Sequence, residues 1–316
     1  MTNPTVAILI ATYNGEMFLK QQLDSILAQT YQNIKIYISD DKSSDSTIKI
    51  LFDYQKKHPN KIFYSVNEEN IGYVKNFENL LLHCPEDYIS LSDQDDIWLD
   101  NKLEIQMHEM LKLEESNKED AYLVHSDLSM IDENNQIIKS SYFKYRNYKL
   151  KDTKDLGHML GPCGVMGNTI LMNKKLKDFV LKFPDKLDLH DYWIGVNCEL
   201  FGVRKTLNLQ LVKYRIHSNN FSNSQAILSK KKFFQSRKDI KLPNLETNRK
   251  YYLPKLYEKI KAGKDIETLD AYMSYLEFKN NRLLTYINLL KFSLIKRNTL
   301  FRIKLFFKIL FTKRYQ

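Results

Sequence analysis

The sequence predicts an α/β fold, in which a mostly parallel sheet carries helices on both faces and a helical extension follows it. Two observations predict this fold. In the first hundred residues, short aliphatic runs alternate with segments whose apolar residues recur at helical spacing. From about Ala226 onward the pattern is helical and increasingly basic. We therefore expect an α/β domain over residues 1–225, with halves at 1–100 and 101–225, and a basic helical region over 226–316.

The first half alternates strands with helices. Helical periodicity is expected after each of the first three strands, most clearly from Gly72 to Leu82. Because a strand, a crossing helix and a second strand form a parallel pair, the carboxyl ends of these strands should share one edge of the sheet. The expected strands are Val6 to Ile10, Ile34 to Ser39, Ile62 to Val66 and Tyr88 to Ser92.

The second half is more mixed. Its helices are expected from Leu103 to Leu113 and from Leu189 to Leu200. Its strands are expected from Ala121 to Ser126 and from Ser129 to Lys139, the second interrupted by a turn at Asp132-Glu133-Asn134-Asn135. A further strand is expected from Val165 to Met172, after a Gly-Pro-Cys-Gly loop at 161–164.

Polar residues follow three of the expected strands. They are Thr12-Tyr13-Asn14, Asp40-Asp41 and the cluster Asp93-Gln94-Asp95-Asp96. Three carboxylates within four residues repel one another, and a hard divalent ion such as Mg²⁺ or Mn²⁺ relieves that repulsion. A solvated acidic turn is the alternative for the last cluster, and a turn that caps the next helix is the alternative for Asp40-Asp41. The coincidence of two acidic clusters at one edge favours a ligand site.

The net charge of +10 is confined to one end of the chain. From Phe278 to Gln316 there are ten Lys or Arg and no Asp or Glu, which leaves 38 basic and 38 acidic residues elsewhere. This balance argues against a nucleic-acid-binding protein, which should carry its basic residues on the folded domain. The segment from Asn288 to Phe311 interleaves Leu, Ile and Phe with Lys and Arg. We expect it to lie on an anionic membrane surface; the alternative is packing on the α/β domain or on another subunit.

Cysteine usage and hydropathy predict the compartment. Cys84, Cys163 and Cys198 are far apart and form no C-x-x-C motif, as is typical of free thiols in a reducing cytoplasm. The first apolar run, Val6 to Ala11, is too short for a secretory signal. We therefore expect a cytoplasmic protein that associates peripherally with the inner face of the cell membrane.

Three segments carry a resemblance to a known family. VAILIATYNG (6–15), ISDDKSSDST (38–47) and LSDQDDIW (91–98) resemble family 2 glycosyltransferases of the GT-A fold, and the resemblance extends over about residues 1–215. It implies a nucleotide-binding half at 1–100 and an acceptor half at 101–225. It places Thr12, Tyr13 and Asn14 at the nucleotide, and Asp41 at the ring of a uracil or thymine.

The resemblance also implies a metal site and a catalytic base. Asp95 is implied as the ligand that ties Mg²⁺ or Mn²⁺ to the diphosphate, and Asp93 as a residue near the ribose and the metal. Because the family inverts the anomeric centre, a further carboxylate must deprotonate the acceptor, and Asp191 is the candidate. Its alternative role is to stabilise the start of a helix.

Two further stretches, HDYW (190–193) and YRIHSNN (214–220), resemble rhamnosyltransferase-type members of the family. His190 is expected either to hydrogen-bond the base or to be structural, and Trp193 to contact the substrate. Arg215 is expected at a phosphate. His217 is expected at the metal or a phosphate, or as an ordinary loop histidine. The 161–164 loop resembles the loop that lines the acceptor side, with Cys163 in packing.

These features together predict an inverting, metal-dependent glycosyltransferase. It would move a sugar, L-rhamnose from dTDP-rhamnose, to a glycan or lipid-linked acceptor in the assembly of a bacterial capsule, O-antigen or cell-wall polysaccharide. One alternative is a UDP-hexose donor, carrying galactose or glucose. A non-catalytic nucleotide-sugar-binding or scaffold protein is the alternative from another class, and a homo-oligomer remains open.

Overall fold

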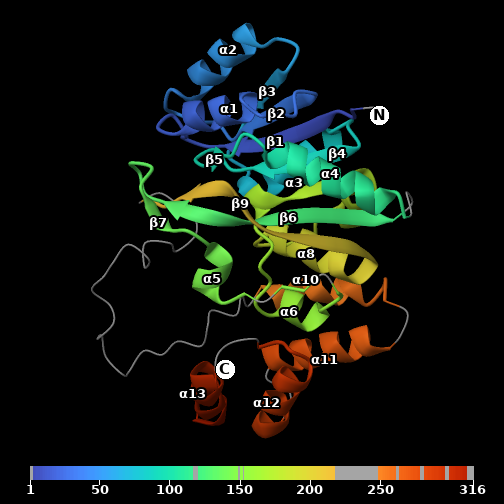
Figure 1. Cartoon of the computed structure of the whole chain (residues 1–316). Helices are drawn as coiled ribbons and strands as arrows, with labels where there is room; N and C mark the ends of the chain where they lie inside the picture. The colour runs from blue at the N-terminus through green and yellow to red at the C-terminus, as the bar shows by residue number, and fades with distance from the viewer. Residues whose placement is uncertain are drawn as a thin grey trace.

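A computed structural model describes residues 3–116, 120–148, 150–151, 153–217, 248–260, 263–277, 281–295 and 299–311. The expected domain boundary at 225, and the helical pattern from Ala226 to residue 247, lie outside the described residues. Within them, the strands form a nine-stranded sheet in the order β3-β2-β1-β4-β8-β6-β9-β5, with β7 paired to β6. Figure 1 shows this sheet crossing the molecule, with helices on both sides of it. The predicted α/β fold class is confirmed.

The first half contains four parallel strands: β1 (Val6–Thr12), β2 (Ile34–Asp40), β3 (Ile62–Val66) and β4 (Tyr88–Ser92). Alternate residues of β1 enter two different cores. Val6, Ile8 and Ile10 pack with helices α1 (Leu19–Leu27) and α2 (Thr47–Lys57). Ala7 and Leu9 pack with α3 (Tyr73–His83) on the opposite face. All four strands therefore present their carboxyl ends at one edge.

The second half extends the sheet beyond β4. β8 (Leu171–Asn173) runs antiparallel between β4 and β6 (Ala121–Ile131), and β9 (Gly202–Arg215) runs parallel to β6. The short β5 (Ile97–Trp98) then pairs antiparallel with the far side of β9. Because β5 directly follows the acidic cluster, this pairing brings residues 93–96 against the end of β9. The helices of this half are α4 (Lys102–Glu114), α5 (Tyr142–Arg146), α6 (Leu156–Leu160), α7 (Lys174–Val180) and α8 (His190–Phe201).

Two sequence-based strand assignments were wrong. β6 continues through the expected break at 126–129. The turn expected at 132–135 is confirmed, and β7 (Ile137–Lys139) follows it. The pairing register of β6 with β9 shifts around Asp127, whose carboxylate bonds the backbone of Leu128, so the irregularity is a bulge and not a break. The expected strand from Val165 to Met172 is instead a 3₁₀ turn, η1 (Gly167–Thr169), followed by β8. The Thr169 hydroxyl donates to the Met166 carbonyl and closes that turn.

The C-terminal helices pack on the α/β domain. They are α10 (Arg249–Tyr252), η2 (Leu253–Leu256), α11 (Lys264–Leu276), α12 (Arg282–Lys291) and α13 (Thr299–Phe311), and they lie at the bottom of Figure 1. The Arg249 guanidinium donates to the Leu160 carbonyl at 3.0 Å and lies 3.6 Å from the Tyr192 ring. Leu305 and Ile309 of α13 are buried in the same apolar cluster as α6 and α8. In the part of the chain that the structure describes, no helix is both long and apolar enough to cross a membrane.

Candidate active site

The loop after β1 is tied to the loop after β2. Thr12 is buried, and its hydroxyl donates to Asp40 Oδ2 at 2.8 Å. Asn14 has a positive φ of 47°, its amide donates to Ser43 Oγ, and its side-chain oxygen accepts from the Ser44 amide. Thr12 and Asn14 therefore shape the two loops by hydrogen bonds within the protein. Tyr13 between them is 49% exposed, so its ring is available to a ligand.

Gln94 is a residue whose role the sequence did not reveal. Its side-chain amide pairs with the backbone of Tyr13: the Tyr13 amide donates to Oε1 at 2.9 Å, and Nε2 donates to the Tyr13 carbonyl at 3.0 Å. The Cα of Gly15 packs closely against the same side chain, in space that a Cβ would fill. Gln94 thus joins the β1 loop to the acidic cluster. Its position inside the Asp-Gln-Asp-Asp run is the only sequence signal that marks it.

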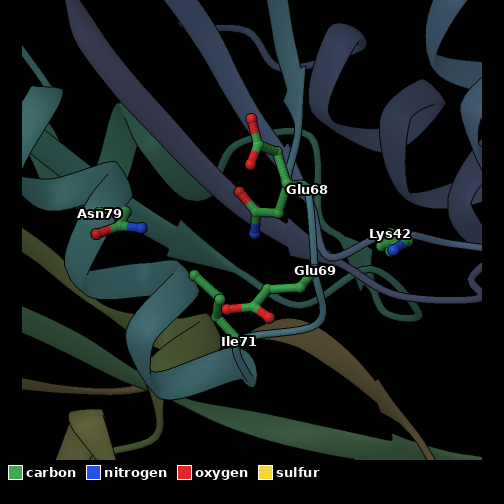
Figure 2. Close-up of a pocket in the computed structure, with 6 residues that line it drawn as sticks. Lys42, Glu68, Glu69, Ile71 and Asn79 are labelled. Atoms are coloured by element: carbon green, nitrogen blue, oxygen red, sulfur yellow. The ribbon is translucent and has the colours of Figure 1, made fainter.

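Asp41 orders the loop after β3. Its carboxylate accepts from the amides of Ile71 and Gly72, each at 2.8 Å, and from Asn67 Nδ2 at 3.0 Å. Gly72 has a φ of +82°, which favours glycine at this turn. Figure 2 shows the hollow beside this loop, lined by residues that include Lys42, Glu68 and Asn79. This hollow therefore lies beside Asn67 and Ile71, two of the residues that bond Asp41.

Three carboxylates share one electrostatic environment at the end of β4 and the start of α8. Burial, together with the charges of Asp95 and Asp191, raises the pKa of Asp93 to about 7. Asp95 Oδ2 lies 2.7 Å from His217 Nε2, in a hydrogen bond that joins the cluster to the segment after β9. The structure thus brings together Asp93, Asp95, Asp191 and His217 from three separate segments of the chain.

Asp96 faces away from this group. Its side chain is fully buried, accepts from the Arg215 amide at 3.0 Å and accepts from Asn168 Nδ2. Burial raises its pKa well above the ordinary range, and the charges of Asp95 and Asp93 add to this effect. Asp96 therefore links η1 to the end of β9 and acts in folding.

Arg215 corrects the sequence-based expectation of a phosphate contact. Its side chain is fully buried and lies 4.4 Å from the Phe18 ring. Nε donates to the Asp95 carbonyl at 2.8 Å, Nη1 donates to Asn135 Oδ1 at 2.6 Å, and Nη2 donates to Gln21. Because its donors already bind protein atoms, Arg215 holds the backbone of Asp95 in place.

Asp191 opens α8 beside η1. Its Oδ1 accepts from the Tyr192 amide at 2.7 Å, and its Oδ2 accepts from the Gly167 amide at 3.2 Å. Burial raises its pKa to about 6, although these two hydrogen bonds and the Arg249 charge oppose the rise. The carboxyl group is therefore ionised at neutral pH but is a stronger base than a solvated aspartate.

The two neighbours of Asp191 that were expected at the substrate are packing residues. His190 is buried and stacks on Phe77 at 4.3 Å, and burial lowers its pKa to about 3, so the ring is neutral. Of the two roles considered for His190, this placement favours the structural one. Trp193 is 2% exposed, and its Nε1 donates to the Val180 carbonyl at 3.0 Å. The substrate contact expected of Trp193 is wrong, because its indole lies in the core with Tyr252.

Potential metal ligands in the described residues are few. No group of three or more His, Cys, Asp or Glu side chains surrounds a common point there. The Asp95–His217 pair supplies one carboxylate and one imidazole. Mg²⁺ and Mn²⁺ are commonly held by one or two protein ligands together with substrate phosphates and water. The pair therefore fits a cation that a phosphorylated substrate helps to bind.

A sheet edge that combines loops after β1 and β2, an acidic cluster after β4 and a carboxylate at a helix start defines the class of GT-A glycosyltransferases. The family model for glycosyl transferase family 2 matches residues 7–173, which is more than half of the chain. The chain belongs to this family and is a glycosyltransferase.

Individual proteins resemble the chain over different lengths. It is 43% identical over 99 residues to the dTDP-rhamnosyl transferase RfbG of Shigella flexneri, covering 30% of this chain and 34% of that one. It is 26% identical over 234 residues to WfgD of Escherichia coli, named a UDP-Glc:alpha-D-GlcNAc-diphosphoundecaprenol beta-1,3-glucosyltransferase. This match covers 74% of this chain and 83% of that one. The crystal structure of S. aureus TarS 1–349 has the same fold, with a TM-score of 0.59 and 14% identity. The match covers 92% of this chain and 83% of that one.

Proposed function

We propose that this glycosyltransferase moves a sugar from a nucleotide diphosphate donor to a saccharide acceptor, with inversion and with the help of Mg²⁺ or Mn²⁺. The observation that carries the proposal is the convergence of the Asp95–His217 pair with Asp93 and Asp191. Acidic groups that cluster beside the carboxyl ends of parallel strands suit a site for a metal-bound diphosphate. Asp95 and His217 would hold the cation, which when bound neutralises charge on the departing diphosphate.

The nucleotide base would lie between Tyr13 and the loop that Asp41 orders. The half-exposed Tyr13 ring offers a stacking surface, and the hollow beside Asn67 and Ile71 offers space for a pyrimidine. Asp41 Oδ2 accepts a hydrogen bond from the Gly72 amide and retains lone-pair capacity for a ring N–H. Asp93, at the end of β4, would face the ribose.

Asp191 would be the general base. Its carboxylate is oriented by two backbone amides and lies within electrostatic range of Asp93. Burial keeps its pKa near 6, which suits proton abstraction from an acceptor hydroxyl at neutral pH. The proton of that hydroxyl would pass to Asp191 while the oxygen attacks the anomeric carbon and the nucleotide diphosphate departs.

The donor we propose is dTDP-L-rhamnose, because the rhamnosyl transferase RfbG shares 43% identity over 99 residues with this chain. A UDP-hexose is the second candidate, supported by the longer match to the glucosyltransferase WfgD. The WfgD name also supports a lipid-linked diphosphate saccharide as the acceptor, in the assembly of an O-antigen, capsule or cell-wall polysaccharide.

A donor screen tests this function. The protein would be incubated with Mn²⁺ and, in parallel, dTDP-rhamnose, UDP-glucose, UDP-galactose or UDP-GlcNAc, and release of nucleotide diphosphate would be measured. We expect the parent to release nucleotide diphosphate fastest from dTDP-rhamnose. We expect the Asp95→Ala variant to release none from any donor. Release from a UDP-hexose alone would transfer the assignment to the second candidate. A scaffold protein would bind a nucleotide without releasing a product from any of them.

We further propose that α12 docks on an anionic membrane, where a lipid-linked acceptor resides. Leu283, Leu284, Ile287 and Leu290 are 37–49% exposed. At 100° per residue they form a stripe about 120° wide. Lys291 extends the stripe, and the opposite face of α12 is buried at Thr285 and Leu289. An exposed aliphatic stripe beside basic residues suits the interface of a bilayer that carries negative charge.

Vesicle binding tests the membrane proposal. We expect the parent to co-sediment with vesicles containing about 30% phosphatidylglycerol, and the Leu283→Glu, Ile287→Glu double variant to lose at least about tenfold in partitioning, since burying each side chain contributes about 2 kcal/mol. A Phe52→Glu, Leu82→Glu variant changes exposed apolar residues on α2 and α3 and should bind like the parent. Equal binding by both variants would discard the proposal. A parent dimer that only the α12 variant dissociates would identify a subunit interface instead.

A further inference from the structure

Next to the catalytic carboxylates lies a cluster of aromatic and cationic side chains. We name it the α5 cluster, and it consists of Tyr142, Tyr145, Arg146 and Tyr148. The Tyr142 and Tyr148 rings meet edge to face at 6.0 Å, and the Tyr142 and Tyr145 rings lie 6.4 Å apart. The Arg146 guanidinium lies 6.0 Å from the Tyr142 ring and 5.9 Å from the Tyr148 ring. The family resemblance assigns a role to none of these four residues.

The cluster stands on a fixed support. Asp127 is buried on β6, and it accepts from the Ser141 hydroxyl and from the Phe143 amide at 2.9 Å. Gln210 on β9 donates to the same carboxylate at 2.8 Å. Phe143 is itself buried. These donors occupy the Asp127 carboxylate, so Asp127 fixes the orientation of α5. It does not form an ion pair with Arg146.

The cluster lies beside the loop that leads to the proposed base. Burial raises the pKa of Tyr142, the charges of Tyr148 and Asp191 raise it further, and Arg146 opposes them. Tyr142 also packs against the same apolar cluster as Met166, the residue before the glycine that bonds Asp191. The Tyr148 ring lies 3.3 Å from the position of a Cβ built on Gly164, in the loop at 161–164. The α5 cluster, this loop and Asp191 therefore border one region.

Arg146 is an exposed cation in that region. Among the ion pairs of the described residues, none involves Arg146. The Tyr142 hydroxyl likewise makes no hydrogen bond to the described part of the protein and is not sealed from solvent. Arg146 also bonds the Tyr148 side chain. A guanidinium carries five N–H donors, and those that remain can bind phosphate oxygens, while tyrosine rings pack against the C–H faces of sugars.

We infer that the α5 cluster is an acceptor subsite for a saccharide that carries a diphosphate, with Arg146 on the phosphate oxygens and Tyr142 and Tyr148 against the sugar. This inference rests on the proposed transferase function, because it uses Asp191 to locate the acceptor hydroxyl. The tyrosines would hold the sugar beside Asp191. The guanidinium would hold the diphosphate one sugar ring away, on the side opposite the metal-bound donor.

A binding measurement tests the subsite without relying on turnover. The protein would be saturated with dTDP and Mn²⁺ to fill the donor site, and then titrated calorimetrically with hexyl-diphospho-GlcNAc or with hexyl β-GlcNAc, which lacks the diphosphate. We expect the parent to prefer the diphosphate probe, and Arg146→Gln to weaken that probe about tenfold while leaving the neutral glycoside unchanged. Tyr142→Ala should weaken both probes, because it removes a ring proposed to pack against the sugar. Lys144→Gln removes an exposed charge from the same helix and should change neither.

Two results would overturn the inference. One is a nucleotide-loaded parent that fails to bind the diphosphate probe. The other is an equal loss of both probes in Arg146→Gln. The donor screen is independent of this measurement, so a protein that releases no nucleotide but binds the probe through Arg146 would lose the proposed function and keep the subsite.

Discussion

Replacing Asp95 with alanine is expected to lower kcat/KM for sugar transfer by about a thousandfold or more, because it removes the carboxylate proposed to bind the metal and hence the charge neutralisation at the leaving diphosphate. The same change should abolish the Mn²⁺-dependent gain in nucleotide affinity, which titration of dTDP or UDP with and without Mn²⁺ would measure. His217→Ala should cause a smaller loss, about 10- to 100-fold, since Asp95 remains as a ligand.

The structure supplies a matched control for this change. Asp100 lies five residues after Asp95, carries the same charge and is exposed. Asp100→Ala should therefore keep parental activity and parental Mn²⁺ dependence. Full activity of the parent in excess EDTA would refute the metal assignment. If Asp95→Ala lost its thermal stability along with its activity, His217→Ala would still test the assignment, because it leaves the hydrogen bonds of Arg215 to Asp95 and Asp96 in place.

The fold of the first half was predictable because local patterns decide it. Each buried strand there is an aliphatic run followed by a turn, and the polar residues at its end can be identified from the sequence. Asp93 and Asp95 were found in this way, since they end a strand whose direction is fixed by its neighbours. The second half was harder, because β8 and η1 depend on contacts with Asp191 and Met166 that no local pattern shows.

The residues around the base show where sequence reasoning fails. Asp191, His190 and Trp193 lie within four positions, and all three were expected at the substrate. A helix turns its successive residues through 100°, so only some of them face any one ligand. The residues that face a ligand were decided by α3, α7 and α10, which bury His190 against Phe77 and Trp193 against Val180 and Tyr252. Arg215 similarly became structural because the β5–β9 pairing brings it under Asp95.

Asp191→Asn is expected to lower kcat by about 10³- to 10⁴-fold, near the upper end of what a general base contributes, while changing nucleotide affinity by less than about twofold. An asparagine has nearly the same shape but no basic oxygen. Its carbonyl can still accept one of the two amide hydrogen bonds, from Tyr192 or Gly167, so the start of α8 should persist. Single-turnover transfer and Mn²⁺-dependent nucleotide titration would measure the two quantities separately.

The separation of rate from affinity is what distinguishes a base from a structural carboxylate. If Asp191 only stabilised the start of α8, Asp191→Asn would lower the melting temperature and would affect nucleotide affinity and kcat together. A base assignment instead requires a parental melting temperature, parental nucleotide affinity and a lost chemical step. Asp185→Asn changes an exposed carboxylate six residues earlier and should leave all three unchanged. Equal transfer rates for Asp191→Asn and the parent would reject the assignment.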